Sequence, residues 1–346
     1  MGHSERIRIG IVGATGYGGQ ELVRLILGHQ GTVLTYLAAT SDVGDATALF
    51  PQFTGASLPN IQAYDSAVCA QACDTVFVAL PSGASGTVAA ELWERGLRVI
   101  DLSGDLRLPP DLYEAWYEKP AVPVKYLETA VYGLSEWNRE QIRTATLLAN
   151  PGCYATAVLL ALVPLARQGM FAPGTSVTVD AKSGVSGAGR GTKLAHQLAE
   201  LADNFFPYRV GAHQHTPEVE QQLGFSTRVL LTTQLLPMAR GIYACAYIPW
   251  LHDMGEADVR QVYAEAYEDA PFVTLLPDEV IPQLKAVRGS NSCHLQTRLD
   301  ERTRTLMVFS AIDNLQKGAA GQAVQNFNLM HGFSEMTGLS AYGLAP

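Results

Sequence analysis

Short apolar segments alternate with helical patterns through the first part of the chain. The apolar segments have the length and β-branched composition of buried strands, and the patterns between them repeat at helical spacing. The predicted strands are 6–12, 33–39, 74–80 and 97–102, and the predicted helices are 20–27 and 87–95. Because strands that alternate with helices build a parallel sheet covered on both faces, this part predicts a doubly wound α/β domain.

The pattern changes further along the chain, where the β-prone segments become longer. They lie at 177–185, 228–249 and 305–312, and helical patterns lie at 188–205, 258–267 and 317–330. The longest apolar run, 155–166, has the character of a buried helix. This mixture predicts a second domain of the α+β class.

Composition limits the kind of protein. The chain has 346 residues, more than one hydrophobic core usually serves, which agrees with two domains. The net charge of −9 argues against general nucleic-acid binding. No apolar run reaches the length of a bilayer span and the chain starts without an apolar signal segment, so we expect a cytoplasmic protein with no membrane partner. The five cysteines are scattered and odd in number, which favours reduced thiols.

A glycine-rich loop follows the first predicted strand, with the spacing G-x-x-G-x-x-G. Glycine permits a tight turn and lets the backbone approach a pyrophosphate, and the helix behind the loop offers unpaired N–H groups. Such a loop is also compatible with an ordinary turn between a strand and a helix. Its place after the first strand favours a dinucleotide site, formed by Gly13, Thr15, Gly16, Tyr17, Gly18 and Gly19.

The end of the second predicted strand bears on the choice of nucleotide. Sites selective for NAD usually carry an acid there, which holds the ribose hydroxyls. Here the strand ends in two alanines followed by Thr40 and Ser41, and the first carboxylate is Asp42. Small hydroxyl residues leave room for a 2′-phosphate and can donate to it. The sequence therefore favours NADP, although Asp42 is an unfavourable neighbour.

Cys153 lies in the segment Asn150-Pro-Gly-Cys153-Tyr-Ala-Thr156, directly before the long apolar helix. The first turn of a helix stabilises a thiolate through the helix dipole, and a thiolate there attacks acyl carbons well. A free cysteine is more often buried and structural. The Pro-Gly approach favours exposure of Cys153, and the other four cysteines have no comparable setting.

The segment Gly211-Ala-His213-Gln-His215-Thr-Pro-Glu218 places two imidazoles and a carboxylate close together. They are compatible with a metal cluster, with an acid/base pair or with polar loop residues. We favour the acid/base role, because it suits thiol chemistry and no other chelating pair stands out. Residues before Pro217 are biased to extended geometry, where positions two apart share a face. Both imidazoles are then expected to point into one cleft.

Together these segments resemble the N-acetyl-γ-glutamyl-phosphate reductases, a family of arginine biosynthesis related to the aspartate-semialdehyde dehydrogenases. The resemblance covers nearly the whole chain. It is carried by GATGYGG (13–19), DLSGDLRL (101–108), VYGLSE (131–136), NPGCYAT (150–156), SGVSGAGR (183–190), HQHTPE (213–218), LLPMARGI (235–242) and DNLQKGAAGQAVQN (313–326).

The resemblance implies a Rossmann-type NADP-binding domain, residues 1–152 with 316–346, and an α+β catalytic and oligomerisation domain, residues 153–315. It implies an acyl phosphate substrate, NADPH as reductant, a thioester on Cys153 and a homodimer or homotetramer. His213 is then the acid/base that serves collapse of the thiohemiacetal, with His215 as the alternative. Supporting roles are expected for Glu218, which would orient the imidazole, and for Arg107 and Arg190, which would hold phosphate or carboxylate. The nucleotide is further expected to meet Ser183, Gly184 and Asn314.

The chain departs from the family pattern at three positions. Ser82 and Gln234 stand where the family usually has histidine, and Ser135 stands where it usually has proline. Neither imidazole position is then expected to be essential. Other readings are a lysine-pathway reductase of the same superfamily, a nucleotide-sensing regulator, and a hydrolase with a metal on His213, His215 and Glu218. The NPGCYAT segment and the HTPE ending favour the arginine-pathway enzyme over the lysine-pathway enzyme, and the presence of Cys153 and both histidines argues against the regulator.

Overall fold

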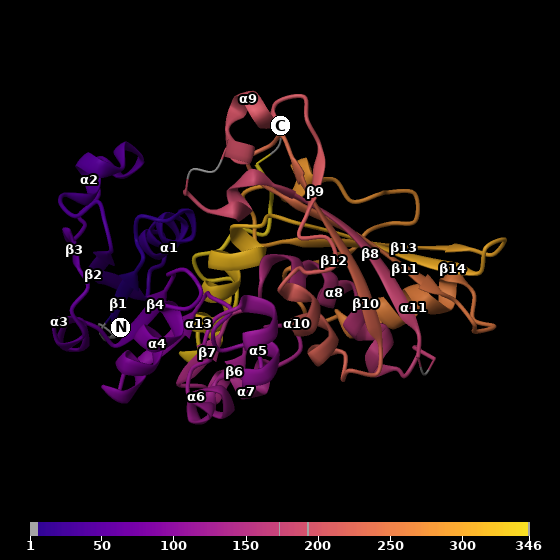
Figure 1. Cartoon of the computed structure of the whole chain (residues 1–346), viewed down its shortest axis with the longest axis horizontal. Helices are drawn as coiled ribbons and strands as arrows, with labels where there is room; N and C mark the ends of the chain where they lie inside the picture. The colour runs from indigo at the N-terminus through magenta and orange to yellow at the C-terminus, as the bar shows by residue number, and fades with distance from the viewer. Residues whose placement is uncertain (1–5, 173, 192–193, 345–346) are drawn as a thin grey trace. The chain divides into compact units, whose positions relative to one another are not determined.

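The computed structural model describes residues 6–172, 174–191 and 194–344. Within it the chain forms two compact units (Figure 1). The first unit is discontinuous: it consists of the chain up to Pro151 together with Ala319–Leu339. The second unit comprises Gly152–Gly318 and the end of the chain from Ser340.

The first unit is built on a parallel sheet with the strand order β3-β2-β1-β4-β5-β7-β6. The strand order reverses direction at β1, which pairs with both β2 and β4. The strands are β1 (Ile7–Val12), β2 (Thr32–Ala39), β3 (Ile61–Ala63), β4 (Thr75–Val78), β5 (Arg98–Asp101), β6 (Val131–Tyr132) and β7 (Leu147–Ala149). The helices are α1 (Tyr17–Leu27), α2 (Ala46–Leu49), η1 (Pro51–Phe53), α3 (Ser66–Ala72), α4 (Ser85–Glu94), α5 (Pro110–Tyr117), α6 (Val124–Thr129), α7 (Arg139–Thr144) and α13 (Gly321–Met330).

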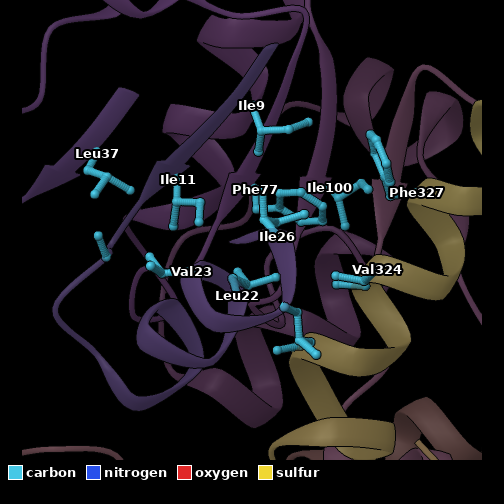
Figure 2. Packing of buried hydrophobic residues seen from close by; sticks show 14 of the residues in the cluster. Ile9, Ile11, Leu22, Val23, Ile26, Leu37, Phe77, Ile100, Val324 and Phe327 are labelled. Atoms are coloured by element: carbon cyan, nitrogen blue, oxygen red, sulfur yellow. The ribbon is translucent and has the colours of Figure 1, made fainter. Parts of the chain in front are cut away.

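Two apolar clusters pack on the sheet of the first unit. One joins the strands to α1 and α13, and the other joins them to α3 and α4. Figure 2 shows the first cluster, where Val324 and Phe327 of the gold helix α13 point at Phe77 and Ile100 of the central strands. Helix α13 is thus part of this core although it comes late in the chain, and all of its residues from Gly321 to Met330 are buried.

The second unit is built on a mixed sheet with the strand order β12-β13-β14-β11-β8-β10-β9. The strands are β8 (Ser176–Gly184), β9 (Phe206–Tyr208), β10 (Arg228–Leu236), β11 (Ile242–Pro249), β12 (Val273–Leu275), β13 (Cys293–Asp300) and β14 (Thr305–Ile312). The helical segments are α8 (Cys153–Arg167), η2 (Val185–Ala188), η3 (Leu194–His196), α9 (Leu198–Leu201), α10 (His215–Gln222), α11 (Glu256–Ala266) and α12 (Leu284–Val287). A π-helical turn, η4 (Gln316–Ala320), leads into α13.

The predicted strands of the first domain all form, with ends that differ by at most two residues. The predicted helices 20–27 and 87–95 form as well, and the first of them begins three residues earlier, at Tyr17. The helical character expected over 188–205 appears only in short segments. Among the described residues there, η3 and α9 are helical and η2 ends at Ala188, and residues 192–193 lie outside the described part. A pattern rich in glycine and polar residues does not supply the continuous apolar stripe that holds a long helix to a core.

The expected domain boundary differs from the structure at the end of the chain. The sequence predicts that residues 316–346 belong to the nucleotide domain, whereas the chain from Ser340 belongs to the second unit. The backbone N–H of Asn291 donates to the carbonyl of Ser340 at 2.8 Å, and that of Leu344 donates to the carbonyl of Arg288 at 2.7 Å. These backbone bonds tie the tail to the second unit, and no local sequence pattern announces them.

Among the described residues, no helix combines the length and the apolar character that crossing a membrane would require.

Candidate active site

The second unit begins with the turn that carries the candidate nucleophile. Cys153 is the first residue of α8, and Gly152 is its N-cap with extended backbone angles, φ −67° and ψ 150°. Cys153 is half-buried, whereas the other four cysteines, Cys69, Cys73, Cys245 and Cys293, are buried. The thiol at the start of α8 is therefore the one that a substrate can reach most readily, at a helix end where a thiolate is stabilised.

Two residues of α10 hold this turn. The backbone N–H of Gly152 donates to Oε1 of Glu218 at 2.8 Å, and Glu218 is fully buried. The imidazole of His215 lies on Gly152, because a β-carbon there would stand 2.4 Å from Nε2 of His215. Glu218 thus binds the nucleophile turn itself, a contact that sequence reasoning did not identify when it assigned this carboxylate to a histidine.

His213 lies just before α10 and is 4% exposed. Its Nδ1 accepts a hydrogen bond from the backbone N–H of His215 at 3.2 Å, so the neutral ring carries its hydrogen on Nε2. Burial, helped by the nearby His215 and Arg209, lowers the pKa of His213 to about 2. His213 is therefore a neutral imidazole at physiological pH, with one N–H to offer.

The expected extended geometry of this segment is wrong. His215 is the first residue of α10, and Gln214 before it is also helical, with φ −59° and ψ −16°. Pro217 falls in the first helical turn, where its missing N–H has no partner to lose. The two imidazoles still approach one another, with ring centroids 4.8 Å apart.

Two tyrosines complete the surroundings of the histidines, and sequence reasoning missed both. Tyr154, at 5.2 Å between ring centroids, and Tyr208, at 5.8 Å, meet His213 edge to face. The hydroxyl of Tyr208 donates to that of Tyr154 at 3.1 Å, and the Tyr154 hydroxyl donates to the Gln234 carbonyl at 3.3 Å. Burial raises the pKa of both phenols, that of Tyr208 to about 12, so both stay protonated. Tyr154 follows the nucleophile directly, which is the one local signal that pointed to it.

Gly318 ends the long chain segment of the second unit and lies against Cys153, near the start of that segment. A β-carbon at Gly318 would stand 2.9 Å from Cβ of Cys153 and 3.2 Å from its Cα. Glycine is needed here for close approach.

The glycine-rich loop of the first unit has the geometry expected of a nucleotide-binding turn. Gly13 has φ +93°, and a β-carbon on it would stand 2.4 Å from the carbonyl oxygen of Ala79. A β-carbon on Gly19 would stand 2.1 Å from the carbonyl oxygen of Gly13. Gly16 is the N-cap of α1, and a β-carbon on Gly18 would meet nothing within 4 Å. The loop is thus closed tightly on the sheet side and has open space at the first turn of α1, which fits a bound pyrophosphate.

The other candidate nucleotide contacts of the first unit are accessible. Tyr17 is 40% exposed at the start of α1, and Thr15 is partly buried in the loop. Thr40 and Ser41 are exposed directly after β2, whose last residues are buried. Their hydroxyls lie at the carboxyl end of the strand next to β1, the edge at which such sheets bind nucleotides.

Three further candidates lie in the second unit, at the end of β8 and after β14. Ser183 is buried and donates to the carbonyl of Gly184 at 2.9 Å. A β-carbon at Gly184 would stand 2.7 Å from the carbonyl oxygen of Ala239. The amide of Asn314 accepts from the Gly241 N–H at 2.7 Å and donates to the Ser186 hydroxyl at 2.9 Å. These bonds make Asn314 a support for the loops around it.

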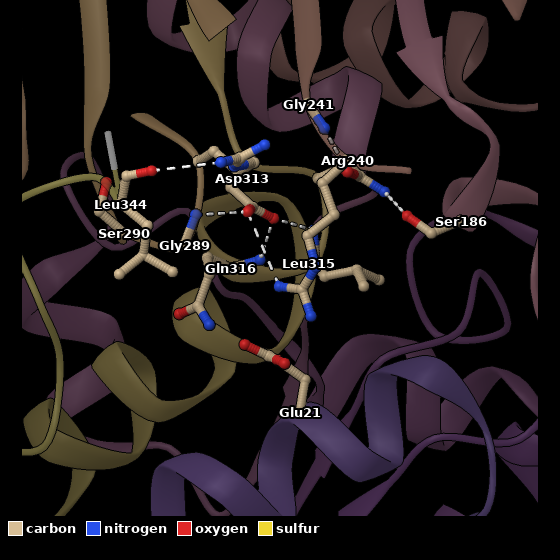
Figure 3. A network of polar contacts seen from close by, with 12 residues as sticks. Glu21, Ser186, Arg240, Gly241, Gly289, Ser290, Asp313, Leu315, Gln316 and Leu344 are labelled. Carbon is tan, nitrogen blue, oxygen red and sulfur yellow. Dashed lines mark hydrogen bonds and ion pairs between the residues drawn. The ribbon is translucent and has the colours of Figure 1, made fainter. Parts of the chain in front are cut away.

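Asp313 organises the same region (Figure 3). Its fully buried carboxylate accepts from the backbone N–H groups of Gly289 at 2.7 Å and Leu315 at 2.8 Å. Arg240 lies 3.7 Å from the same carboxylate. Asp313 is a functional candidate that sequence reasoning did not single out, although it begins one of the segments that carry the resemblance.

The two candidate arginines differ in setting. Arg107 is 7% exposed in the first unit, and its guanidinium donates to the carbonyls of Asn150 at 2.8 Å and Leu102 at 2.9 Å. Arg190 is exposed in the second unit.

The departures from the family pattern also have definite contacts. The Ser82 hydroxyl accepts from the Gly104 N–H at 3.2 Å, and the Gln234 amide donates to Asp180 at 2.8 Å. Ser135 is fully buried and donates to Asn326 at 2.7 Å. Within the described residues, no group of three or more His, Cys, Asp or Glu side chains is arranged to hold a metal ion.

Comparison with known proteins defines the class first. Residues 8–145 match the family described as semialdehyde dehydrogenase, NAD binding domain, and residues 153–314 match semialdehyde dehydrogenase, dimerisation domain. Aspartate semialdehyde dehydrogenase II of Vibrio cholerae, complexed with ASA, has the same fold, with a TM-score of 0.71 at 20% identity over 95% of this chain and 99% of that one. The NADP-bound aspartate semialdehyde dehydrogenase of Candida albicans has a TM-score of 0.69 at 17% identity over 94% of this chain and 98% of that one.

Sequence comparison then narrows the class. The N-acetyl-γ-glutamyl-phosphate reductases of Brevibacillus brevis and of Bacillus subtilis are each 45% identical to this chain, over 98% of its length and 100% of theirs. The chain belongs to the N-acetyl-γ-glutamyl-phosphate reductase family and is an oxidoreductase of arginine biosynthesis. The predicted family, fold class and NAD(P)-binding domain are confirmed.

Proposed function

We propose that this chain reduces N-acetyl-γ-glutamyl phosphate to N-acetylglutamate 5-semialdehyde through a thioester on Cys153. The observation that carries the proposal is the turn at the start of α8, where the half-buried thiol stands on a backbone held by Glu218 and His215. The thiolate attacks the acyl carbon, a C–S bond forms, and the bond to the phosphate oxygen breaks with release of phosphate. Hydride addition to the thioester carbon and cleavage of the C–S bond then give the aldehyde and return the thiolate.

NADPH is the reductant we propose, and when bound it supplies the hydride. Its pyrophosphate would lie over the backbone of Gly16 to Gly19, where the space at Gly18 is open. Thr40 and Ser41 would hold the 2′-phosphate. Ser183, Gly184 and Asn314 are further proposed contacts of the nucleotide; the side-chain bonds of Asn314 to Gly241 and Ser186 favour a supporting role.

His213 is the residue we propose to serve the acyl oxygen. Because its Nδ1 is occupied by a backbone N–H and its pKa is strongly lowered, the ring acts through the hydrogen on Nε2. It would donate to the oxygen that becomes negative when hydride reaches the thioester. A fixed donor at this place stabilises the charge that develops in the transition state. His215 then positions the nucleophile turn and the substrate.

Glu218 and the two arginines complete the proposal. Glu218 holds the Gly152 N–H and so keeps the turn in place. Arg107 donates to the carbonyl of Asn150, three residues before Cys153 in the chain. Arg190, exposed and cationic, is the proposed contact for the substrate phosphate or carboxylate.

The match of the second unit to a dimerisation domain supports a homo-oligomer, and we propose a homodimer or homotetramer. All five cysteines are free thiols, which suits a reducing compartment, and we propose the cytoplasm.

The function is tested by the reverse reaction. N-acetylglutamate 5-semialdehyde, phosphate and NADP⁺ should produce NADPH absorbance, with omission of phosphate as the control. Replacing NADP⁺ by NAD⁺ should lower kcat/KM, because no carboxylate holds the ribose at Thr40 and Ser41. Turnover without phosphate, or only with an aspartate-derived aldehyde, would contradict the proposal.

A further inference from the structure

Asn150 is fully buried and every polar group of it is engaged. Its backbone N–H donates to the carbonyl of Asp101 at 2.8 Å, and its own carbonyl accepts from Arg107 at 2.8 Å. Its side-chain Nδ2 donates to the carbonyl of Ala319 at 3.1 Å, and its Oδ1 accepts from Asn326 at 3.1 Å. A residue held at four points by the first unit cannot rotate or shift without breaking buried hydrogen bonds.

Behind Asn150 lies a relay of buried polar side chains, formed with Asn326 and Gln322 of α13 and with Ser135. Gln322 donates to the Ser135 hydroxyl at 2.8 Å, and Ser135 donates to Oδ1 of Asn326 at 2.7 Å. Nδ2 of Asn326 donates to the carbonyl of Gly133 at 2.7 Å as well as to Asn150. Each group in the relay therefore has one defined orientation, and Asn326 presents its donor to Asn150.

Ser135 contributes a hydroxyl to this relay. It stands where the resemblance leads one to expect proline, and proline has no hydroxyl to donate or accept. In this chain the hydroxyl fixes the orientation of the Asn326 amide, and Gly133 lets that amide approach, since a β-carbon there would stand 2.5 Å from Nδ2 of Asn326.

Only Pro151 and Gly152 separate Asn150 from Cys153. Proline has a restricted φ, and the N–H of Gly152 is held by Glu218, so few backbone torsions between Asn150 and Cys153 are free. We infer that Asn150 is a positioning residue for Cys153, oriented by the relay of Ser135, Gln322 and Asn326. This inference rests on the proposed thioester function. Asn150 would set the position of the Cys153 sulfur relative to the acyl carbon. An error of about 1 Å in that position can cost on the order of 10²-fold in rate.

Helix α13 supplies a matched pair of variants. Asn326→Ala removes the donor to Asn150. Asn328→Ala removes an equally buried amide two residues on, which is bonded to His29 at 2.9 Å and donates to the carbonyls of Glu335 at 3.0 Å and Thr337 at 2.9 Å. Both should lower the Tm by similar amounts. Only Asn326→Ala should lower kcat, by about tenfold or more, with KM for the aldehyde little changed.

A second readout reports on the thiol directly. Iodoacetamide reports on Cys153, because Cys153 is the one half-buried thiol and the other four are buried. It should alkylate Cys153 more slowly in Asn326→Ala than in Asn328→Ala, since a displaced turn holds the thiol less well at the helix end that stabilises the thiolate. Ser135→Ala is the milder test if Asn326→Ala fails to fold, and it should lower kcat and alkylation in the same sense by a smaller factor.

Equal kcat and equal alkylation rates in the Asn326→Ala and Asn328→Ala variants would overturn the positioning role. A higher KM for the aldehyde with an unchanged kcat in Asn326→Ala would also overturn it. Failure of the thioester proposal is seen separately, as turnover that survives Cys153→Ser.

Discussion

The imidazole of His215 rests on the backbone of Gly152: a β-carbon on this glycine would stand 2.4 Å from Nε2 and 2.6 Å from Cε1 of the ring. Gly152 has backbone angles that any residue adopts, φ −67° and ψ 150°. The requirement for glycine is therefore one of space, and it joins the histidine segment to the residue that precedes the nucleophile.

We predict that Gly152→Ala lowers both stability and turnover. The added methyl group must displace the imidazole or the turn, and overpacking of this kind costs about 1–3 kcal/mol. Gly255→Ala is the matched control: Gly255 is also an extended N-cap glycine of the second unit, and its β-carbon would meet nothing nearer than 4.0 Å. Tm and kcat should fall in Gly152→Ala alone. Equal Tm values for the two variants would show that the His215 ring can move away from the added methyl group without loss of stability.

The nucleophile is tested by single substitutions of each cysteine. Cys153→Ser should abolish turnover, since serine at a helix N-terminus is a far weaker nucleophile at neutral pH. Serine at Cys69, Cys73, Cys245 or Cys293 should leave activity largely intact, because these thiols are buried and none of them begins a helix. Mass spectrometry after acid quench should detect an acyl adduct on the peptide with Cys153. Normal rates in Cys153→Ser would exclude the thioester.

The two histidines should separate kinetically. We expect His213→Asn to lower kcat by about 10²-fold or more, because it removes the Nε2 donor to the developing oxyanion. We expect His215→Asn chiefly to raise KM for the acyl substrate. Acyl-enzyme formation should survive in His213→Asn, since the helix end acts on Cys153 independently. A collapse of kcat confined to His215→Asn would exchange the two roles and leave the thioester step in place.

Acid should destabilise the second unit through His213. Its pKa is about 2 in the folded chain and 6.5 as a free side chain, so below pH 6.5 the unfolded chain binds a proton that the folded chain does not. Stability then falls with decreasing pH, by up to about 1.4 kcal/mol per pH unit for this one group. Thermal unfolding at pH 8 to 5 should show the Tm falling below pH 6.5, with a shallower slope in His213→Gln.

The first unit contains an opposing group, which supplies an internal control. Burial raises the pKa of Asp101 to about 6, so this carboxyl takes up its proton more readily in the folded chain and stabilises it as pH falls through 6. His331, whose pKa burial and Arg98 lower to about 4, acts in the destabilising direction. Because intrinsic amide exchange slows as the pH falls, the comparison uses protection factors, which should fall more steeply on acidification around His213 than around Asp101. An equal fall in both units would contradict this assignment.

The elements that depend on neighbouring residues were predictable from the sequence. β1, the glycine loop and α1 follow from an apolar run, the steric freedom of glycine and a helical stripe, all within the first 27 residues. The placement of Cys153 at the first turn of α8 follows in the same way, because Pro-Gly ends one element and a continuous apolar stretch begins the next.

The contacts that make these residues a site depend on partners far apart in the chain. Glu218 binds the N–H of Gly152, 66 residues away, where local reasoning had paired it with a neighbouring histidine. Asn326 reaches Asn150 across 176 residues, and Ser340 leaves the first unit for the second. A buried donor must find an acceptor wherever packing brings one, and periodicity carries no information about which one that is. The sequence by itself thus determined the family, the candidate nucleophile and the order of elements, and the tertiary structure decided which side chains hold the turn at Cys153 in place.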